Sequence, residues 1–281
     1  MKWLSDLFVS KNRLLLMFIF DIYAAYSIPV TQLRNVQKER WQPAYCAMYG
    51  LSNFFKEIVY LHEYLFTPDT IKIMTAALPF YLSSRMIDEN IHSHFYDPSC
   101  HKNIRQLPDS FTKAVEHLAF YGVVGLSSMA VWGPRADLRT TGRIFAVGAI
   151  SGLYLKDFIK SFKSNGNLRP FNQNFSPTCR SQGGFPSGHM FEAAYMATVF
   201  GLQYGLGAWI PLSLFSGAMF VVSVNANRHY VSQVFAGAAL GIIYGVAASK
   251  TIDDSLNGGI WDVGIRCDSQ GNPAVQVAYN F

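Results

Sequence analysis

The feature that most restricts how this chain can fold is a series of long apolar stretches in its second half. Five stretches of helix length follow one another, at about 115–133, 143–160, 188–205, 209–226 and 231–249. Each approaches the roughly 20 apolar residues that cross a bilayer as a helix. Glycines recur inside the stretches, as is typical of helices that pack closely. The sequence therefore predicts an all-α fold, a helical bundle.

The composition favours a membrane location for this bundle. Only 15% of the residues are charged and 50% are hydrophobic, whereas soluble domains carry about 25% charged residues. Glu116, His117 and Glu192 interrupt the apolar stretches, so a soluble bundle of very apolar helices is the alternative. The net charge of +5 is mild and comes without a long basic run. This argues against nucleic acid as a partner.

Residues 1–31 have the pattern of a signal sequence. Lys2, Lys11 and Arg13 flank the start of a long apolar run, which is typical of a signal peptide or a signal anchor. Residues 25–27 form only a weak cleavage site. We therefore expect an uncleaved N-terminal signal anchor, with a cleaved signal peptide as the alternative.

Six membrane spans follow if the anchor and the five apolar stretches all cross the bilayer. The connection at 133–143 holds three arginines, and basic residues concentrate in cytoplasmic connections. With that connection in the cytoplasm, segments 161–187 and 227–230 fall on the non-cytoplasmic side. That side is a periplasm, a lumen or the extracellular space.

Residues 32–114 differ from the apolar core at 115–250. Their short apolar stretches are interrupted by Pro43, Pro68, Pro79, Pro98 and Pro108. Proline inside a helix removes a hydrogen bond and disfavours continuation of the helix. We expect a non-cytoplasmic region of short helices and loops.

The polar tail at 251–281 contains two stretches with strand character. Residues 260–265 and 274–279 are rich in β-branched and aromatic residues. The Asp-Ser-Gln-Gly-Asn-Pro sequence between them is typical of a turn. The tail therefore predicts a small C-terminal β-hairpin.

The cysteines and one polar cluster give no metal motif. Four cysteines without a Cys-x-x-Cys pair argue against a zinc site. Cys100 and Cys179 share the oxidising side in the six-span topology and could form a disulfide, with unpaired thiols as the alternative. A polar cluster precedes the core, and we interpret it as a solvated face; it consists of Asp88, Glu89, His92, His94, Asp97 and His101.

Three polar segments lie between the predicted helices, on the same side of the membrane. They are residues 160–170, 183–189 and 223–233. The first carries lysines and an arginine, which neutralise phosphate oxygens. The second leads into a helix N-terminus, where free N–H groups favour an anion. Histidines in the second and third segments can act as nucleophile and general acid.

The order and spacing of these segments resemble the type 2 phosphatidic acid phosphatase and vanadium haloperoxidase superfamily. Its pattern is Lys-x6-Arg-Pro, then Pro-Ser-Gly-His, then Ser-Arg-x5-His-x3-Asp. The matching residues lie within about 160–245 and are Arg169-Pro170, Pro186-Ser187-Gly188-His189, His229-Tyr230 and Ala236-Gly237. The resemblance implies a helical bundle that, in the membrane branch, has six spans and a site on the non-cytoplasmic face.

The resemblance also implies a role for each matching residue. His229 would be the nucleophile that forms a phosphohistidine, and His189 would be the acid that protonates the leaving alkoxide. Ser187, the Gly188 backbone, Arg169 and a lysine would hold the phosphate. Neither a metal nor another cofactor is expected.

Three positions depart from the pattern of the superfamily. Phe162 stands in the lysine position between Lys160 and Lys163, and we favour Lys160 because it ends an apolar helix. Ser223 replaces the arginine, which leaves a candidate substrate contact without its charge. Gln233 replaces the aspartate and is expected to orient the imidazole of the nucleophile through a hydrogen bond. Arg228 or Arg180 could supply the missing charge.

The leading functional hypothesis is a membrane phosphatase that hydrolyses a phosphomonoester or diphosphate, with a phosphorylated lipid as substrate. A lipid could approach the site laterally from the bilayer. The alternative is a catalytically weakened or inactive member of the superfamily that serves as a structural or ligand-binding subunit. A vanadium haloperoxidase is a third possibility, because vanadate mimics phosphate.

Overall fold

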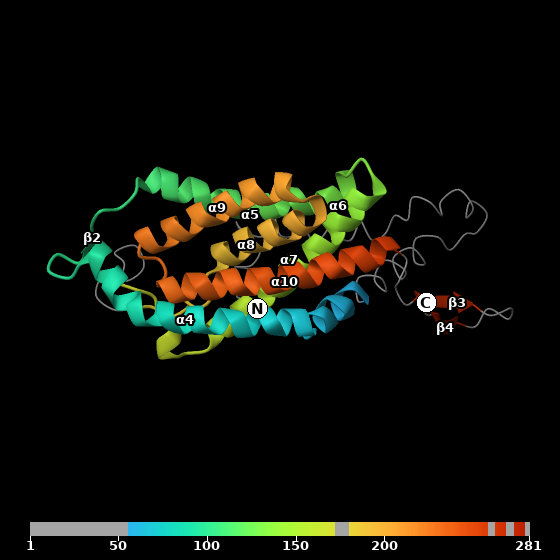
Figure 1. The fold of residues 1–281 in the computed structure, drawn as a ribbon, viewed down its shortest axis with the longest axis horizontal. Helices are drawn as coiled ribbons and strands as arrows, with labels where there is room; N and C mark the ends of the chain where they lie inside the picture. The colour runs from blue at the N-terminus through green and yellow to red at the C-terminus, as the bar shows by residue number, and fades with distance from the viewer. Residues whose placement is uncertain (1–55, 172–179, 258–261, 268–272, 279–281) are drawn as a thin grey trace, which may run out of the picture. The chain divides into compact units, whose positions relative to one another are not determined.

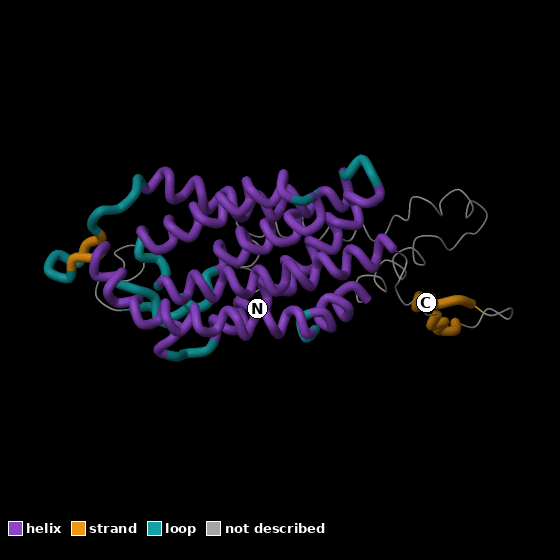
Figure 2. Tube along the Cα trace, viewed as in Figure 1, coloured by secondary structure: helices purple, strands orange, loops and turns teal. Residues whose placement is uncertain are grey.

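The computed structural model describes residues 56–171, 180–257, 262–267 and 273–278. Helices dominate this part of the chain, drawn as coiled ribbons in Figure 1 and in purple in Figure 2. They are α4 (Pro68–Phe95), α5 (Asp109–Ser127), α6 (Met129–Trp132), α7 (Ala136–Ser161), α8 (Gly188–Tyr204), α9 (Leu206–Asn225) and α10 (Val231–Asn257). Residues 56–64 are also helical, and a short 3-10 helix covers Asn165–Asn167. The predicted all-α character of the core is confirmed.

Helix α4 runs without interruption for 28 residues, so the expectation of short helices broken by prolines was wrong here. Pro68 occupies the first turn, where a missing N–H leaves no hydrogen bond unmade. Pro79 lies inside the helix. Beyond it, the ring of Phe80 stacks on that of Phe235 in α10, with 6.0 Å between their centroids. Packing against α10 thus stabilises the continuation of α4 beyond Pro79, where local helix propensity alone would favour the end of the helix.

Contacts within the chain define two compact units, of which one comprises residues 61–123 and 148–249. The apolar core of this unit surrounds α8, which is buried along most of its length. Core side chains come from α5, α8, α9 and α10 and include Ala119, Met190, Ala193, Met219, Val222 and Val234. Gly241 lets α10 approach α8 closely, because a Cβ at this position would lie 2.6 Å from the Phe191 carbonyl oxygen. This packing fixes the helix ends that carry the predicted site.

Two short antiparallel strand pairs accompany the helices. After α4, β1 (Tyr96–Asp97) pairs with β2 (Lys102–Asn103). In the tail, β3 (Asp262–Cys267) pairs with β4 (Pro273–Ala278) from one end to the other. Cys100, near the first pair, is exposed and has a free thiol. Its predicted partner Cys179 lies outside the described residues.

Three described helical segments are long and apolar enough to cross a membrane, where six spans were predicted for the whole chain. They are Asp109–Trp132, Leu206–Asn225 and Val231–Asn257. Helix α9 also exposes large apolar side chains, among them Leu206, Trp209, Ile210, Leu214 and Val221. A row of exposed apolar side chains is typical of a surface that contacts lipid or another apolar partner. The predicted signal anchor at 1–31 lies outside the described residues.

Candidate active site

The three polar segments predicted from the sequence meet in the structure. The carbonyl oxygen of Gly184 accepts a hydrogen bond from Nδ1 of His229 at 2.7 Å. The N–H of Gly184 donates to the Asn167 carbonyl at 2.8 Å, and the N–H of Ser187 donates to the Gln233 carbonyl at 3.0 Å. Residues far apart in the sequence therefore form one site.

Asn167, which no sequence motif marks, organises the first of these segments. Its buried side-chain amide donates to the carbonyls of Lys160 at 2.8 Å and Phe162 at 2.7 Å. Its Oδ1 accepts from the N–H of Phe185 at 2.9 Å. These bonds tie the end of α7 to the segment that precedes α8. Asparagine is common in loops for its bonds to nearby backbone, so its presence alone does not predict this role.

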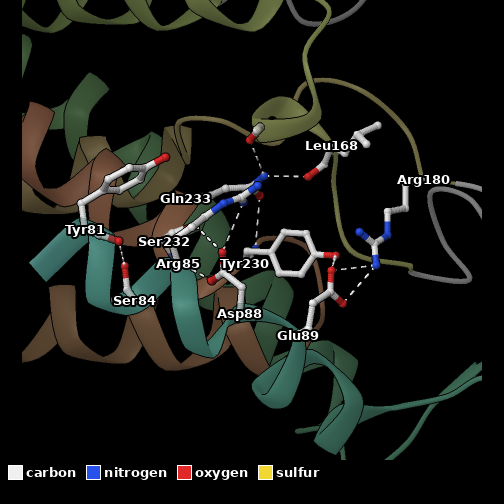
Figure 3. A network of polar contacts seen from close by, with 11 residues as sticks. Tyr81, Ser84, Arg85, Asp88, Glu89, Leu168, Arg180, Tyr230, Ser232 and Gln233 are labelled. Atoms are coloured by element: carbon white, nitrogen blue, oxygen red, sulfur yellow. Dashed lines mark hydrogen bonds and ion pairs between the residues drawn. The ribbon is translucent and has the colours of Figure 1, made fainter.

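Gln233 is completely buried. Its side chain binds the backbone of the first polar segment, residues 160–170, and not the imidazole of His229. Its Nε2 donates to the Leu168 carbonyl at 2.7 Å, and its Oε1 accepts from the N–H of Tyr230 at 3.2 Å (Figure 3). The expectation that Gln233 orients the imidazole is therefore corrected, since the Gly184 carbonyl takes that role. A neutral amide can donate to backbone carbonyls, which an ionised aspartate cannot do.

His229 is only 6% exposed and is surrounded by positive charge. Burial, followed by the charges of Arg169 and Lys160, holds the pKa of His229 well below its ordinary value of 6.5. The imidazole is therefore neutral at physiological pH. Because a carbonyl oxygen can only accept, Nδ1 carries the proton that binds Gly184, and Nε2 keeps its lone pair.

Two lysines of α7, rather than one, lie at the site. Lys160 is half-buried and close enough to act electrostatically on His189. Lys156, one turn earlier, places its Nζ 3.3 Å from the position of a Cβ on Gly188. Lys163 is exposed. Lys156 was missed, although its four-residue spacing from Lys160 puts both side chains on one helix face.

The two arginines at the site are linked through the backbone. Nη1 of Arg169 donates to the Arg228 carbonyl at 3.2 Å. The guanidinium of Arg228 forms an ion pair with the buried carboxylate of Glu116 on α5 and acts electrostatically on His189. The structure thus brings Arg228, proposed from the sequence as a substitute for the missing arginine, to the same site.

Ser223, in the arginine position of the superfamily pattern, is buried in α9. Its hydroxyl donates to Sδ of Met219, one turn earlier, at 3.7 Å. Its carbonyl oxygen accepts from the N–H groups of Arg228 and His229, at 3.2 and 3.4 Å. In this structure Ser223 supports the turn that carries the histidine, and its contact with substrate stays a prediction.

The N-terminus of α8 has groups suited to bind an anion. Helix α8 begins at Gly188, directly after Ser187, and His189 is its second residue. Ser187 is completely buried, and its Oγ has no hydrogen-bond partner within the described residues. A buried hydroxyl without a partner, beside free helix N–H groups and two lysines, is suited to bind a phosphate oxygen.

Two members of the cluster interpreted as a solvated polar face are buried instead. Asp88 is 4% exposed and His92 is 7% exposed. Burial raises the pKa of Asp88, an effect that its hydrogen bonds with Ser232 oppose, and burial lowers the pKa of His92. Their four-residue spacing puts both on one face of α4. Across residues 56–171 and 180–257, no group of three His, Cys, Asp or Glu side chains is arranged to hold a metal.

One family model and two known proteins are similar to this chain. The sequence model of the PAP2 superfamily matches residues 141–256. A Lipid A 1-phosphatase of Porphyromonas gingivalis is 28% identical over 152 residues, which are 51% of this chain and 33% of that protein. This chain therefore spans about a third of the length of that relative.

A crystal structure of a transmembrane PAP2-type phosphatidylglycerolphosphate phosphatase from Bacillus subtilis is also similar. It is 16% identical, and the match covers 73% of this chain and 96% of that one with a TM-score of 0.38. All three segments of the candidate site lie inside the residues that match the superfamily. The match to the PAP2 superfamily thus covers the part of the chain that carries the candidate site.

Proposed function

We propose that this protein hydrolyses a phosphate ester of a lipid through a phosphohistidine at His229. The observation that carries the proposal is the hydrogen bond from Nδ1 of His229 to the Gly184 carbonyl. It leaves an unprotonated Nε2 in a buried, positively charged site. A neutral, oriented imidazole of this kind is a competent nucleophile at phosphorus.

The cations and the helix N-terminus would bind the phosphoryl group. Lys156, Lys160 and Arg169 would neutralise its oxygens, while Ser187 Oγ and the N–H groups at the start of α8 would donate hydrogen bonds. Such fixed donors stabilise charge on the phosphoryl oxygens without reorganisation during the reaction.

The reaction would proceed in two displacements. Burial and the charges of Arg228 and Lys160 lower the pKa of His189 to about 4, and the negative charge of a bound phosphate would raise it so that His189 takes up a proton from solvent. The lone pair on Nε2 of His229 forms the N–P bond while the P–O bond to the lipid breaks, and the lipid oxygen takes that proton from His189. Water then attacks phosphorus and gives a proton to His189. The N–P bond breaks, its electron pair returns to Nε2, and inorganic phosphate leaves.

A lipid is the substrate class that the remaining observations favour. The similar protein of P. gingivalis is named as a Lipid A 1-phosphatase, and the chain has apolar helices of membrane-spanning length. Arg135 directly precedes α7, Arg139 and Arg143 lie near the start of this helix, and Lys160 lies near its end. Basic residues favour the cytoplasmic side, which supports a site on the non-cytoplasmic side.

A second candidate is a catalytically weakened protein that binds phosphorylated lipids. Ser223 leaves the arginine position without charge, and the guanidinium of Arg228 is already paired with Glu116. On this alternative, phosphate would bind at the N-terminus of α8 without turnover.

Phosphate release by the purified full chain in detergent separates the two candidates. The substrates are lipid A, phosphatidic acid, an isoprenyl diphosphate and p-nitrophenyl phosphate. Wild type and the control His62→Ala, which changes an exposed histidine, should release phosphate from at least one lipid, whereas His229→Ala should not. Folded wild type that releases none, or His229→Ala that retains the wild-type rate, would refute the proposed function.

A further inference from the structure

We propose that Asp88 is a positioning residue for His229, acting from α4 on the turn that carries the nucleophile. The inference rests on the proposed function, because it gives Asp88 a part in the reaction at His229. Helix α4 precedes residues 141–256, the part of the chain that matches the superfamily. A segment outside the matched core would thus complete the site.

The carboxylate of Asp88 binds the first turn of α10, directly after the turn that carries the nucleophile. Its Oδ1 accepts from the N–H of Ser232 at 2.9 Å, and its Oδ2 accepts from the Ser232 hydroxyl at 2.5 Å (Figure 3). Asp88 is 4% exposed and Ser232 is 0% exposed. A carboxylate satisfies an otherwise free N–H of the first turn and complements the positive end of the helix dipole. Asp88 therefore caps α10 from another helix.

Two further side chains of α4 hold the same turn on either side of His229. Glu89 accepts from the hydroxyl of Tyr230 at 3.0 Å, as Figure 3 shows. Nδ1 of His92 donates to Oδ1 of Asn227 at 3.0 Å. The turn is therefore bonded to α4 before and after the histidine, and Asp88 makes the most deeply buried of these contacts.

The direction of the imidazole depends on how this turn is held. The ring of His229 binds the Gly184 carbonyl through Nδ1, and the backbone on either side sets where Nε2 points. Asp88, Asn227, His229 and Tyr230 lie close together, and His229 is part of the turn, so a displacement of the turn also displaces the histidine. Displacement of a reacting group by about 1 Å can lower a rate by about 10²-fold.

The test compares four variants of the full chain in detergent with wild type. Asp88→Ala removes both hydrogen bonds with Ser232 and the contact of Oδ2 with Nη1 of Arg85 at 3.4 Å. Ser232→Ala removes only the hydrogen bond from the hydroxyl. Asp88→Asn keeps both, because its amide can accept from the Ser232 N–H and donate to the Ser232 oxygen. Met86→Ala, at a position 83% exposed on the same helix, is the matched control.

Two readouts are measured for each variant. The first is kcat and KM for p-nitrophenyl phosphate. The second is the Kd for orthovanadate, a tetrahedral phosphate analogue, by titration calorimetry. Thermal melting gives the folded fraction, to which both readouts are normalised.

Positioning by Asp88 predicts a change in kcat rather than in KM. Asp88→Ala should lower kcat by about 10- to 100-fold with KM within about twofold, and should weaken orthovanadate binding by about 10-fold. Ser232→Ala should show a smaller loss of the same kind. Asp88→Asn should stay within about threefold of wild type, and Met86→Ala should be unchanged.

The proposal is overturned if Asp88→Ala and Ser232→Ala keep kcat and the orthovanadate Kd within about twofold of wild type. It is also overturned if Asp88→Asn loses as much as Asp88→Ala. If Asp88→Ala does not fold, Ser232→Ala decides. If wild type binds orthovanadate but hydrolyses none of the substrates, only the proposed function fails. The Kd values of the variants for orthovanadate then decide whether Asp88 positions His229. If wild type does neither, both proposals fail.

Discussion

Nδ1 of His229 lies 2.7 Å from the carbonyl oxygen of Gly184, and this hydrogen bond defines the chemistry of the site. It fixes the tautomer of a buried, neutral imidazole and leaves Nε2 as the basic nitrogen. Gly184 lies against the side chain of Gln233. A Cβ on residue 184 would come within 2.6 Å of Oε1 of Gln233, so glycine suits this position. Gln233 thus contacts Gly184, whose carbonyl oxygen binds the proposed nucleophile.

Protonation of two buried histidines is expected to destabilise the fold on acidification, whereas protonation of Glu192, whose pKa burial raises to about 7, acts in the opposite direction. Burial lowers the pKa of both His92 and His229 from the ordinary value of 6.5, so below about pH 6.5 the unfolded chain takes up protons that the folded chain does not. The contribution of the two neutral imidazoles to the unfolding free energy is fully present above that pH. It is lost as the pH falls toward the pKa values that the two histidines have in the folded state. The measurement is the unfolding free energy in detergent between about pH 7.5 and about pH 5.

His92→Gln provides the control for this pH dependence. Glutamine can still donate to Asn227 but does not titrate, so the fall in unfolding free energy with acidification should become shallower. If the unfolding free energy of His92→Gln falls with pH as steeply as that of wild type, His92 does not contribute to the pH dependence of stability.

Removing Arg228 should impair catalysis and leave Glu116 as an unpaired buried carboxylate. Arg228 acts electrostatically on His189 and adds positive charge near the phosphate site; an interaction with a charged group is worth about 1.5–3 kcal/mol, so Arg228→Ala should lower kcat/KM by about 10- to 100-fold. It should also lower the melting temperature, because burying an unpaired charge is unfavourable. Adding Glu116→Gln should restore the melting temperature but not kcat/KM. Recovery of both would assign Arg228 a purely structural role.

Asn167→Ala should destabilise the protein by about 1–3 kcal/mol, because it removes three part-buried hydrogen bonds, to the carbonyls of Lys160 and Phe162 and from the N–H of Phe185. Asn167→Asp should be no better, since a carboxylate cannot donate to the carbonyls of Lys160 and Phe162. Asn165→Ala, at an exposed position two residues earlier, is the matched control. Equal unfolding free energies for the variants at 165 and 167 would contradict the role given to Asn167.

Lys156 and Lys160 should both contribute to substrate binding. Each single replacement by alanine should lower kcat/KM for a lipid phosphate by about 10-fold or more, through the loss of a charged contact. Lys72→Ala, which removes an exposed lysine on α4, should have no effect. An unchanged kcat/KM in Lys156→Ala would limit the cation site to Lys160 and the arginines.

The convergence of the three segments could be predicted because the residues of each stand next to a helix boundary that the sequence marks. Ser187 and His189 flank a helix start, and His229 lies in the turn between two apolar stretches. The partners of these residues could not be predicted in the same way. Whether Gln233 bonds an imidazole or a backbone carbonyl depends on how closely α10 approaches the first segment, which only tertiary packing decides.

Helix α4 illustrates the same limit for the fold. Pro79 and the charged residues near its C-terminus indicated short helices with a solvated face, because local patterns carry no information on what covers them. Two contacts with α10 contradict these expectations. Phe235 packs on Phe80 directly after Pro79, where the helix was expected to end, and Ser232 binds Asp88, which was expected to be solvated. The spacing of Asp88 and His92 did place both on one face, which is the signal that the sequence contained.

The most direct test of the account is to trap the covalent intermediate. Full-length protein is mixed with a radiolabelled lipid phosphate, quenched in alkali within milliseconds to seconds, and digested for mass spectrometry. The account predicts an alkali-stable, acid-labile phosphate on Nε2 of His229 that forms and decays at the rate of turnover and is absent from His229→Ala. Turnover of the labelled lipid with the phosphate on another residue, or with no phosphorylated protein at any time, would contradict it.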